Sequence, residues 1–376
     1  MMKICYVVTI ADTITVFFAR QLKYLAEKGY DVSVICSPNQ YLQGRLGEKV
    51  RYIPAEIPRG ISFSGSIKAI DSLVRIFKKE KFDLIQYSTP NAAFYASIAS
   101  RIAGCKVRNY HLMGFRYAGS TGKGRIILKT IEKITCNNST SIECVSPSNM
   151  NFGIREGLFP PDKVSVVWNG STGGVDTDRF SYEKRDIWRA EIREETGCNE
   201  SDFVYGFAGR ITRDKGINEL LTAFLKLKTD AKLLLVGPMD DLQSLNPKML
   251  EKARENPNII FHKGVYDIQR YYAAMDVLVL PSYREGFGNV VIEAASVGTP
   301  AIVSDIPGPT DAISTDTAIT VPPRDAKALY QAMKTIRKMD YSQMGKNAAV
   351  FAKENFDSEI LCEKIYERKQ VLLENS

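Results

Sequence analysis

Two glutamates stand on either side of a glycine-containing turn in the stretch "REGFGNVVIEAASVGTPAIVSD", residues 284–305. The turn follows "DVLVLPS", an apolar run typical of a buried strand, and a helix is predicted over 289–297. Gly286 and Gly288 permit a tight backbone at this point. The first amides of the predicted helix then lie at the positive end of its dipole, an arrangement that binds phosphate.

The two glutamates could bind sugar hydroxyls next to this predicted phosphate site. A carboxylate can accept hydrogen bonds from sugar hydroxyls, as an acidic residue does for ribose in dinucleotide-binding folds. Glu293 lies in the predicted helix and Glu285 in the loop before it. A helix that carries Glu in its first turns to complement the dipole would account for Glu293, but not for Glu285 beside the glycines. The pattern therefore predicts a ligand with hydroxylated rings on both sides of a diphosphate, which is a nucleotide sugar.

A second loop offers the cations that a diphosphate needs. In "GFAGRITRDKGINELLTAF", residues 206–224, Gly209 ends a predicted strand, and Arg210 and Lys215 lie in the loop before a helix. Arg can clamp phosphate oxygens bidentately, and Lys supplies a point charge. Taken alone, the loop could be a solvated basic segment. Together with the two-glutamate turn, it predicts a diphosphate site.

Three other patterns do not fit their motifs. "YAGSTGKG" at 117–124 resembles a P-loop, but Tyr117 stands where the motif needs Gly, and Gly124 where it needs Ser or Thr. The first predicted strand leads into "TIADTIT", which lacks the glycines of a dinucleotide fingerprint. "DTD" at 176–178 resembles an acidic metal-binding triplet but lies in a predicted linker. An NAD enzyme and a bound metal are therefore not expected.

Composition indicates a globular protein of ordinary type. The chain has 376 residues, 44% hydrophobic and 25% charged, enough for two domains. Its seven cysteines are scattered and form no CxxC, which favours reduced thiols in the cytosol. The two histidines, His111 and His262, are too few for a histidine-built metal site. The most apolar N-terminal run, "ICYVVTIADTITVFFA", is short and carries Asp12, so neither a signal peptide nor a transmembrane helix is expected.

The charge of the chain is unevenly distributed. Residues 1–175 carry 23 Lys and Arg against 12 Asp and Glu, a net charge of +11, whereas the remainder has a net charge of −4. This asymmetry predicts that the first half meets an anionic partner. The alternative is that surface lysines only keep the protein soluble.

Apolar strand-like runs alternate with helical patterns in two successive series. The first extends from "KICYVVT" to "KVSVVW", and the second from "FVYGFAG" to "PAIVSD". Continuous Val, Ile and Leu runs are typical of parallel strands buried on both faces. Turn residues concentrate between the series in "NGSTGGVDTDRF", residues 169–180. The sequence therefore predicts an α/β protein of two doubly wound domains, whose ligands lie outside the carboxyl ends of the strands. Helices are predicted over 13–28, 90–103, 122–135, 147–157, 217–227, 241–254, 267–274, 289–297 and 357–373.

These motifs together resemble those of glycosyltransferase family 4. "EGFGNVVIEA" has the glutamate–seven residues–glutamate spacing of retaining GT-B glycosyltransferases, and "GRITRDKGINELL" and "NGSTGGVD" are similar to other motifs of the family. "STPNAAFYASIASRIAG" and "VSPSNMNFGIREGL" resemble the branch that builds bacterial capsule, O-antigen and lipid-linked glycans. The resemblance covers nearly the whole chain and implies the GT-B fold, two Rossmann-like domains facing across a cleft. It implies an acceptor-binding domain at 1–172, a nucleotide-sugar-binding domain at 173–356, and a helix at 357–376 that crosses back to the first domain.

The resemblance also implies roles for individual residues. Arg210 and Lys215 would hold the donor diphosphate, and Glu293 would bind the ribose. Glu285 would lie near the transferred sugar, and neither a metal nor another cofactor is expected. The residues expected to contact the donor are Gly209, Arg210, Lys215, Gly264, Val265, Glu285, Phe287, Gly288, Asn289, Val290, Val291 and Glu293, with the base near Gly264 and Val265.

One departure from the family pattern concerns a histidine. Many relatives carry it directly before the glycine that ends the fifth N-terminal strand. In "YHLMGFR" this position holds Met113, and His111 lies two residues earlier, on the same face of a strand. Two interpretations stay open: His111 serves the cleft as a catalytic residue, or it packs beneath the loop. Transfer need not depend on it, because the main demand is to stabilise the departing diphosphate.

The leading hypothesis is a retaining hexosyl- or N-acetylhexosaminyltransferase. It would move a sugar from a UDP-sugar, with N-acetylhexosamine as the favoured sugar, to a polyprenyl-diphosphate-linked glycan in bacterial surface polysaccharide assembly. A GDP-mannose donor is one alternative. A UDP-sugar 2-epimerase of the same fold is disfavoured because it should show more histidines, and a sugar-nucleotide-binding module without activity is a third possibility.

A lipid-linked acceptor implies contact with a membrane. We expect the protein in the cytoplasm, bound peripherally to the inner face of the cell membrane, with no nucleic-acid partner. Two basic loops, 59–68 with Ile61 and Phe63, and 115–129, would make the contact at about 1 kcal/mol per cation. The alternative is that these cations bind only the phosphates of the acceptor. The residues expected on the acceptor and membrane side are Asn91, Arg59, Lys68, Arg116, Lys123 and Arg125.

Overall fold

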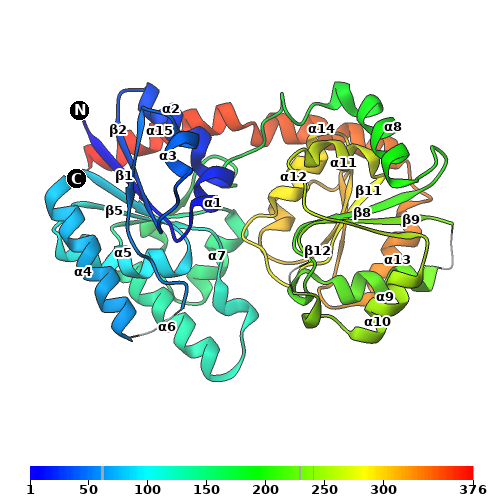
Figure 1. Ribbon diagram of the computed structural model, residues 1–376, viewed down its shortest axis with the longest axis horizontal. Coiled ribbons are helices and arrows are strands. Elements are labelled where there is room, and N and C mark those ends of the chain that lie inside the picture. The colour runs from blue at the N-terminus through cyan, green and yellow to red at the C-terminus, as the bar shows by residue number, and fades with distance from the viewer. Residues whose placement is uncertain (61–62, 228–229, 240, 376) are drawn as a thin grey trace. The chain divides into compact units, whose positions relative to one another are not determined.

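The computed structural model describes residues 1–60, 63–227, 230–239 and 241–375. Its chain divides into two compact units. Unit 1 comprises Met1–Gly173 and Glu359–Ser376, and unit 2 comprises Gly174–Ser358. Each unit is a parallel sheet with helices on both of its faces, which confirms the predicted α/β class (Figure 1).

Unit 1 contains a seven-stranded parallel sheet in the order β3-β2-β1-β4-β5-β6-β7. The chain first builds one side of the sheet from β1 and then the other side from β4, so the topological switch point lies between these two strands. The strands are largely buried, as in a sheet covered on both faces, although β5 and β6 include the buried polar residues Asn109, His111 and Glu143. They are β1 (Lys3–Val7), β2 (Asp31–Cys36), β3 (Val50–Pro54), β4 (Leu84–Tyr87), β5 (Val107–Leu112), β6 (Ser141–Cys144) and β7 (Val164–Val166).

Two apolar cores cover the two faces of this sheet. One joins helices α4 and α5 to the strands through Leu73, Phe77 and Ala96. The other joins α2 and α3 through Leu22 and Leu42, and α15 packs against this second core. The helical elements of unit 1 are α1 (Ala11–Thr13), a π-helical turn (Ile14–Phe18), α2 (Ala19–Glu27), α3 (Leu42–Leu46), α4 (Phe63–Glu80), α5 (Pro90–Ile102), a 3₁₀ turn (Arg116–Gly119), α6 (Gly122–Asn138), α7 (Pro147–Arg155), a 3₁₀ turn (Pro161–Lys163) and α15 (Ser358–Glu374).

A buried ion pair fastens α15 to the sheet of unit 1. Lys369 Nζ lies 2.9 Å from Glu143 Oε2 on β6, and both side chains are buried. Burial alone would raise the pKa of Glu143, but the Lys369 ammonium lowers it to about 2. Breaking such a pair leaves an uncompensated charge in the interior, which costs about 3–5 kcal/mol. The last helix is therefore an integral part of unit 1.

Unit 2 contains a six-stranded parallel sheet in the order β10-β9-β8-β11-β12-β13. Helices α8, α11, α12 and α14 lie on one face of it, and α9, α10 and α13 on the other (Figure 1). The strands are β8 (Val204–Ala208), β9 (Lys232–Val236), β10 (Ile259–His262), β11 (Val277–Leu280), β12 (Ala301–Ser304) and β13 (Ala318–Val321). The helices are α8 (Arg185–Thr196), α9 (Ile217–Leu227), α10 (Pro247–Glu255), α11 (Ile268–Ala274), α12 (Asn289–Ser296), α13 (Ala326–Ile336) and α14 (Tyr341–Phe356).

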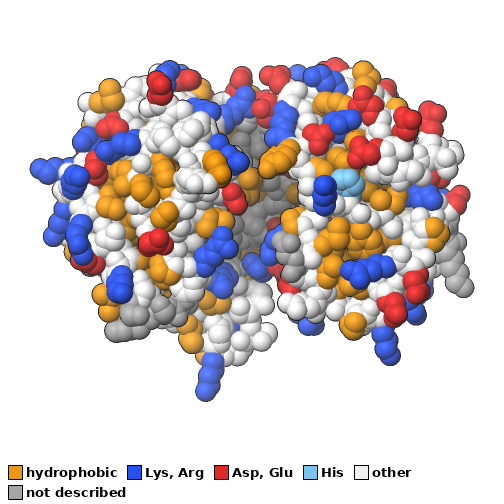
Figure 2. Space-filling model, in the orientation of Figure 1, with side chains coloured by type: hydrophobic (Ala, Val, Ile, Leu, Met, Phe, Trp, Pro, Cys, Tyr) orange, Lys and Arg blue, Asp and Glu red, His pale blue; other side chains and the backbone are white. Residues whose placement is uncertain are grey.

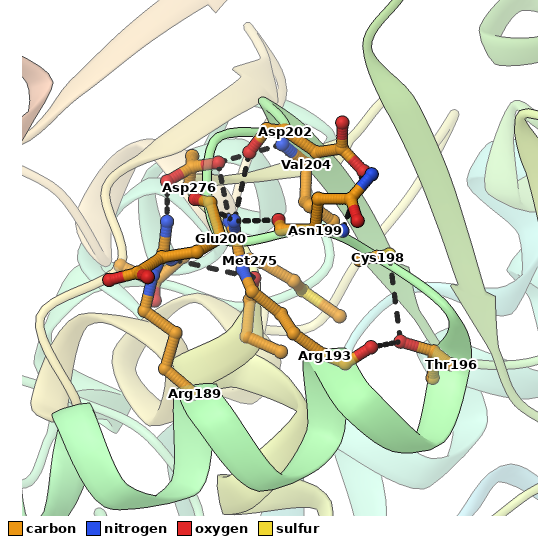
Figure 3. A network of polar contacts seen from close by, with 12 residues as sticks. Arg189, Arg193, Thr196, Cys198, Asn199, Glu200, Asp202, Val204, Met275 and Asp276 are labelled. Carbon is orange, nitrogen blue, oxygen red and sulfur yellow. Dashed lines mark hydrogen bonds and ion pairs between the residues drawn. The ribbon is translucent and has the colours of Figure 1, made fainter.

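A buried polar network holds α8 against the two central strands of unit 2 (Figure 3). Asp276, directly before β11, accepts hydrogen bonds from Arg189 at 2.6 Å and Arg193 at 2.8 Å. The same carboxylate accepts the backbone N–H of Val204, the first residue of β8, at 2.7 Å. Burial lowers the pKa of Arg193, and Asp276 opposes that shift. The network thus fixes the starts of β8 and β11, whose far ends carry the candidate site.

The predicted helix 13–28 is present as helical residues 11–27, with a π-helical turn at Ile14–Phe18. Three other secondary-structure predictions were wrong. Residues 59–68 and 115–129, predicted as loops, contain the starts of α4 and α6. The predicted helix 241–254 begins only at Pro247, because Pro favours the first helical position and the Asn246 side chain caps the next amides. Among the described residues, no helix combines the length and apolar character that crossing a membrane requires.

Candidate active site

The switch point of unit 2 lies between β8 and β11. The chain continues from β8 to β9 and β10 on one side, and from β11 to β12 and β13 on the other. The loops that follow β8 and β11 therefore diverge and leave the crevice in which open α/β sheets bind ligands. These loops, residues 209–216 and 281–288, contain Arg210, Lys215 and Glu285.

The two loops contact each other at successive residues. The Tyr283 N–H donates to the Asp214 carbonyl at 2.9 Å, and the Arg284 guanidinium lies 3.2 Å from the Asp214 carboxylate. One residue further on, Lys215 Nζ lies 2.6 Å from Glu285 Oε1. Two segments about 70 positions apart are thus held side by side, and the predicted phosphate cation lies against the predicted sugar-binding carboxylate.

Gly216 permits this close approach. It has a φ of +73°, and a Cβ at this position would lie 2.0 Å from the Pro281 carbonyl oxygen in the neighbouring loop. Any larger residue would push the loops apart and separate Lys215 from Glu285.

The two predicted cations differ in how firmly they are held. The Lys215 side chain is 20% exposed and the Glu285 side chain 13%, and the Ser282 hydroxyl donates to the same Glu285 oxygen at 2.8 Å. The Arg210 side chain is 60% exposed and lies 3.7 Å from the Asp214 carboxylate. Lys215 and Glu285 therefore form a preorganised pair, whereas Arg210 is open to an incoming anion.

Asp214 forms ion pairs with Arg210 of its own loop and Arg284 of the neighbouring loop. Burial raises its pKa, but the Thr212 hydroxyl at 2.5 Å and the charges of Arg284, Arg210 and Lys215 bring the pKa below its ordinary value. Sequence reasoning missed this residue, although an acidic side chain between Arg210 and Lys215 was a visible signal. Ser282 was missed as well, and no sequence pattern pointed to it.

The start of α12 forms the third part of the site. Gly288 caps the helix with a φ of +95°, which a side chain would disfavour. Phe287 is buried and packs edge-on against Phe356 at 5.2 Å, which fixes the turn. The Val291 N–H donates to the Gly288 carbonyl at 2.8 Å, so this amide is engaged within the first turn. The other predicted amides, those of residues 287–290, lie at the start of the helix.

Glu293 lies one turn further along α12 and is half-buried. The Tyr272 hydroxyl of α11 donates to its Oε2 at 2.9 Å. Burial raises the pKa of Glu293, while the Tyr272 hydrogen bond and the charge of Arg179 lower it. Tyr272 thereby orients the carboxylate that was predicted to bind ribose, and nothing in the sequence linked these two residues.

Backbone contacts bring the remaining donor residues to the same edge of the sheet. The Gly209 N–H donates to Val236, and the Ile211 N–H donates to Pro238, which connects the loops after β8 and β9. The Gly237 N–H donates to His262 at the end of β10, directly before the loop with Gly264 and Val265. Gly264 is exposed and Val265 half-buried. The predicted donor residues of unit 2 therefore lie on adjoining loops at the carboxyl edge.

His111 is enclosed within unit 1. It lies on β5, is 7% exposed, and has Nε2 3.4 Å from Thr172 Oγ1, with Phe18 edge-on at 5.5 Å. It lines a small internal cavity together with Glu143 and Lys369. Burial lowers the pKa of His111 to about 4, although Glu143 opposes the shift. The ring is therefore buried among side chains of unit 1.

Two residues expected on the acceptor side line one small hollow of unit 1. Asn91, at the start of α5, and Arg116, after β5, lie there with Glu132 of α6. Asn91 also donates to the Pro58 carbonyl at 2.8 Å and so holds the segment before Arg59. Glu132 was missed from sequence: it is buried, accepts a hydrogen bond from Tyr110 at 2.6 Å, and has its pKa raised to about 7 by burial.

The other cations of the predicted membrane loops are at the surface. Arg59, Lys68, Arg116 and Lys123 are exposed, whereas Arg125 is half-buried and lies 3.3 Å from Glu156. Lys68 belongs to α4 and Lys123 to α6, so neither is in a loop. Ile61 lies outside the described residues. Figure 2 shows Lys and Arg side chains interspersed with hydrophobic ones over the visible face of unit 1.

Two doubly wound parallel units in one chain, with a cation–carboxylate cradle at the switch point of the second, are the features expected of the GT-B fold. Residues 189–351 match the family described as Glycosyl transferases group 1, and residues 3–146 match the Glycosyl transferase 4-like family. The chain belongs to this group of glycosyltransferases, which confirms the family resemblance and the enzyme class.

Several similar proteins are bacterial glycosyltransferases. The capsular polysaccharide biosynthesis glycosyltransferase CapM of Staphylococcus aureus is 28% identical, over 100% of this chain and 98% of that protein. The UDP-Gal:alpha-D-GlcNAc-diphosphoundecaprenol alpha-1,3-galactosyltransferase of Escherichia coli is also 28% identical, over 77% of this chain and 75% of its own. Among solved structures, Anabaena Alr3699/HepE in complex with UDP shares the fold with a TM-score of 0.79 and 18% identity, over 98% of this chain and 100% of that one.

Proposed function

We propose that this glycosyltransferase is a retaining enzyme that transfers a sugar from a UDP-sugar to a polyprenyl-diphosphate-linked glycan in bacterial capsule or related surface polysaccharide assembly. N-acetylhexosamine is the sugar we favour. The observation that carries the proposal is the contact at 2.6 Å between Lys215 and Glu285 across the switch point of unit 2.

The residues of unit 2 supply what a nucleotide-sugar donor requires. When the bond between the sugar and the diphosphate breaks, negative charge develops on the leaving diphosphate. Arg210 and Lys215 meet this charge, with the amides at the start of α12, and such preorganised groups are usually the largest single contribution to catalysis. Glu285, fixed by Ser282, binds the hydroxyls of the transferred sugar. We propose that this cradle needs no bound metal, so activity should survive EDTA.

Both carboxylates of the site already have a partner within the protein. Glu285 is paired with Lys215, and Glu293 accepts from Tyr272. Such an arrangement suits stabilisation of a leaving group better than attack by a side chain. We propose that Glu293 binds the ribose and that the base lies over Gly264 and Val265. We propose that His111 packs beneath the loop that follows β5.

The names of similar proteins support UDP and a lipid-linked acceptor. The Escherichia coli relative is named for UDP-Gal and a diphosphoundecaprenol acceptor, and the Anabaena structure contains UDP. GDP-mannose is the second candidate donor, since the phosphate cradle itself does not distinguish the bases.

The excess positive charge of the first half leads us to propose peripheral membrane association. Lys123 is exposed at the start of α6, next to Ile126 and Ile127, which are 67% and 55% exposed. Cations beside exposed apolar residues are typical of proteins that bind anionic membrane surfaces. Co-sedimentation with anionic vesicles that lack acceptor tests this: we expect salt-sensitive binding that Lys123→Ala weakens. Failure to bind at low salt would leave only the acceptor's phosphates as partners of these cations.

A donor panel tests the enzymatic proposal. Purified protein is incubated with UDP- and GDP-sugars, with and without a short-chain prenyl-diphosphate-linked acceptor, and products are identified by mass spectrometry. We expect acceptor-dependent transfer from one UDP-sugar. Acceptor-independent conversion to the 2-epimer would instead identify an epimerase, and binding of an intact donor a module without activity.

A further inference from the structure

A hollow of about 490 Å³ lies at the amino edge of the sheet of unit 1. The ends of α4 and α5 and the segments that lead into β4 and β5 line it. Its volume is within the range of about 300–1,000 Å³ that is usual for small-molecule sites. Asn91 and Arg116 follow the carboxyl ends of the same two strands, so this hollow is at the opposite edge of the sheet from the acceptor residues.

Three lysines give the hollow its charge. Lys78, Lys81 and Lys106 line it, and all three are exposed. Within the described ranges, no carboxylate lies within ion-pair distance of any of the three. The carboxylate of Asp83, which also lines the hollow, accepts the backbone N–H of Lys3 at 2.7 Å. The hollow therefore has an excess of positive charge.

The floor beneath these lysines is apolar. Phe77, Phe82 and Ile85 are buried there, with the two phenyl rings edge-to-face at 6.3 Å. Met2, half exposed, forms part of the wall. The apolar side chains open to a ligand are Met2 and the half-buried Leu373 of α15. A ligand that fits this lining carries an anionic group for the lysines and an apolar body for these two side chains.

The backbone at Lys81 supports a role in binding. Lys81 follows the last residue of α4 with a φ of +54°, a left-handed conformation that is unfavourable for a residue with a side chain. Gly29, Gly104 and Gly197 follow α2, α5 and α8 in the same conformation without that strain. A lysine near a helix end can complement the dipole, which accounts for Lys78. It does not account for a strained Lys81 or for Lys106 before β5.

We propose that this hollow is a second ligand site that binds a phosphate ester with an apolar body. The phosphate lies among Lys78, Lys81 and Lys106, and the apolar part lies against Met2 and Leu373. The ligand is either a soluble phosphate ester or a lipid phosphate, since both present the same chemistry to these side chains.

Isothermal titration of the full chain tests the site with three probes: phenyl phosphate, inorganic phosphate, and dihexanoyl phosphatidic acid below its micelle concentration. We expect saturable binding of an apolar ester that is tighter than that of inorganic phosphate and weakens with salt. Lys81→Gly and Lys106→Ala should each weaken it about fivefold, the factor that corresponds to about 1 kcal/mol per cation. Lys23→Ala, which removes an exposed lysine of α2, should leave it unchanged.

The outcomes separate the possibilities. Lys81→Gly should keep or raise the melting temperature because glycine relieves the left-handed strain, so weaker binding would not reflect unfolding. Binding of phenyl phosphate identifies a soluble source, and binding of phosphatidic acid alone identifies a lipid. Absence of saturable binding by every probe, or equal affinities in wild type, Lys81→Gly and Lys106→Ala, overturns the proposal.

Discussion

Replacing Lys215 with alanine removes the cation that contacts Glu285 and that we assign to the leaving diphosphate. The pair lies largely out of water, at 20% and 13% side-chain exposure, so its charges are weakly screened. Losing one preorganised group that meets developing charge costs roughly 2.7–4 kcal/mol, or about 10²–10³ in kcat. Without Lys215, Glu285 would also present an unpaired carboxylate to the donor phosphates. We therefore expect Lys215→Ala to lower both UDP affinity and kcat.

A double-mutant cycle isolates this second effect. Glu285→Gln keeps the Ser282 hydrogen bond and frees Lys215 for the diphosphate, so UDP should bind as well as to wild type while transfer falls. In Lys215→Ala/Glu285→Gln the repulsive carboxylate is gone, and part of the lost UDP affinity should return. The expected coupling is about 0.5–3 kcal/mol, typical of residues in contact.

Titration calorimetry with UDP measures the affinity for UDP, and a coupled assay of UDP release measures turnover. Lys248→Ala, which removes an exposed lysine of α10, serves as the control. Turnover near wild type in Lys215→Ala would refute the diphosphate assignment. Strictly additive UDP affinities would refute the functional pairing of Lys215 with Glu285.

Three further predictions concern other residues. Glu293→Gln should weaken UDP binding itself, because ribose is common to donor and product; calorimetry giving wild-type affinity would contradict the ribose assignment. Asp276→Asn should lower the free energy of unfolding, measured in urea, by about 3–5 kcal/mol, because the buried Arg193 loses its ion-pair partner. The control Glu191→Gln breaks an exposed ion pair of α8 and should change the free energy of unfolding by at most about 1 kcal/mol. Burial raises the pKa of Glu132 to about 7, so the folded state binds this proton more tightly than the unfolded state, and the free energy of unfolding should fall by about 3 kcal/mol as pH rises from 4.5 to 7. Glu132→Gln should abolish this pH-dependent component. The same pH profile of unfolding in wild type and Glu132→Gln would show that the pKa of the carboxyl is not perturbed.

Much of the fold was predictable because many strands, such as β9 and β11, are mostly apolar runs. Such runs are typical of parallel strands covered on both faces, and the structure confirms the α/β class. Helix α4 was missed because Gly60, Ser64 and Gly65 made the segment resemble a loop. Its apolar side chains at Ile70, Leu73 and Phe77 do recur at helical spacing. That signal was present and was given too little weight.

The site was predictable in its parts but not in its contacts. Arg210, Lys215 and Glu285 could be singled out because each lies in a loop after a strand. That Lys215 meets Glu285 follows from the adjacency of β8 and β11, which tertiary packing determines. The same holds for Tyr272 on Glu293, where the partner comes from another helix.

The enclosure of His111 could not be predicted from its own strand. On β5, alternation allows the side chain to face either the ligand edge or the core. The groups that close its cavity come from distant segments, Glu143 of β6 and Lys369 of α15. Their pairing across 226 positions depends on the return of the last helix to unit 1.

The anomeric configuration of the product tests the central claim most directly. Purified protein, a UDP-N-acetylhexosamine and a short-chain prenyl-diphosphate-linked acceptor are combined, and the new linkage is analysed by proton NMR. The account predicts that UDP is released, that the product keeps the α configuration of the donor, and that both are lost in Lys215→Ala. A product of β configuration, or transfer from none of the UDP-sugars, would contradict it.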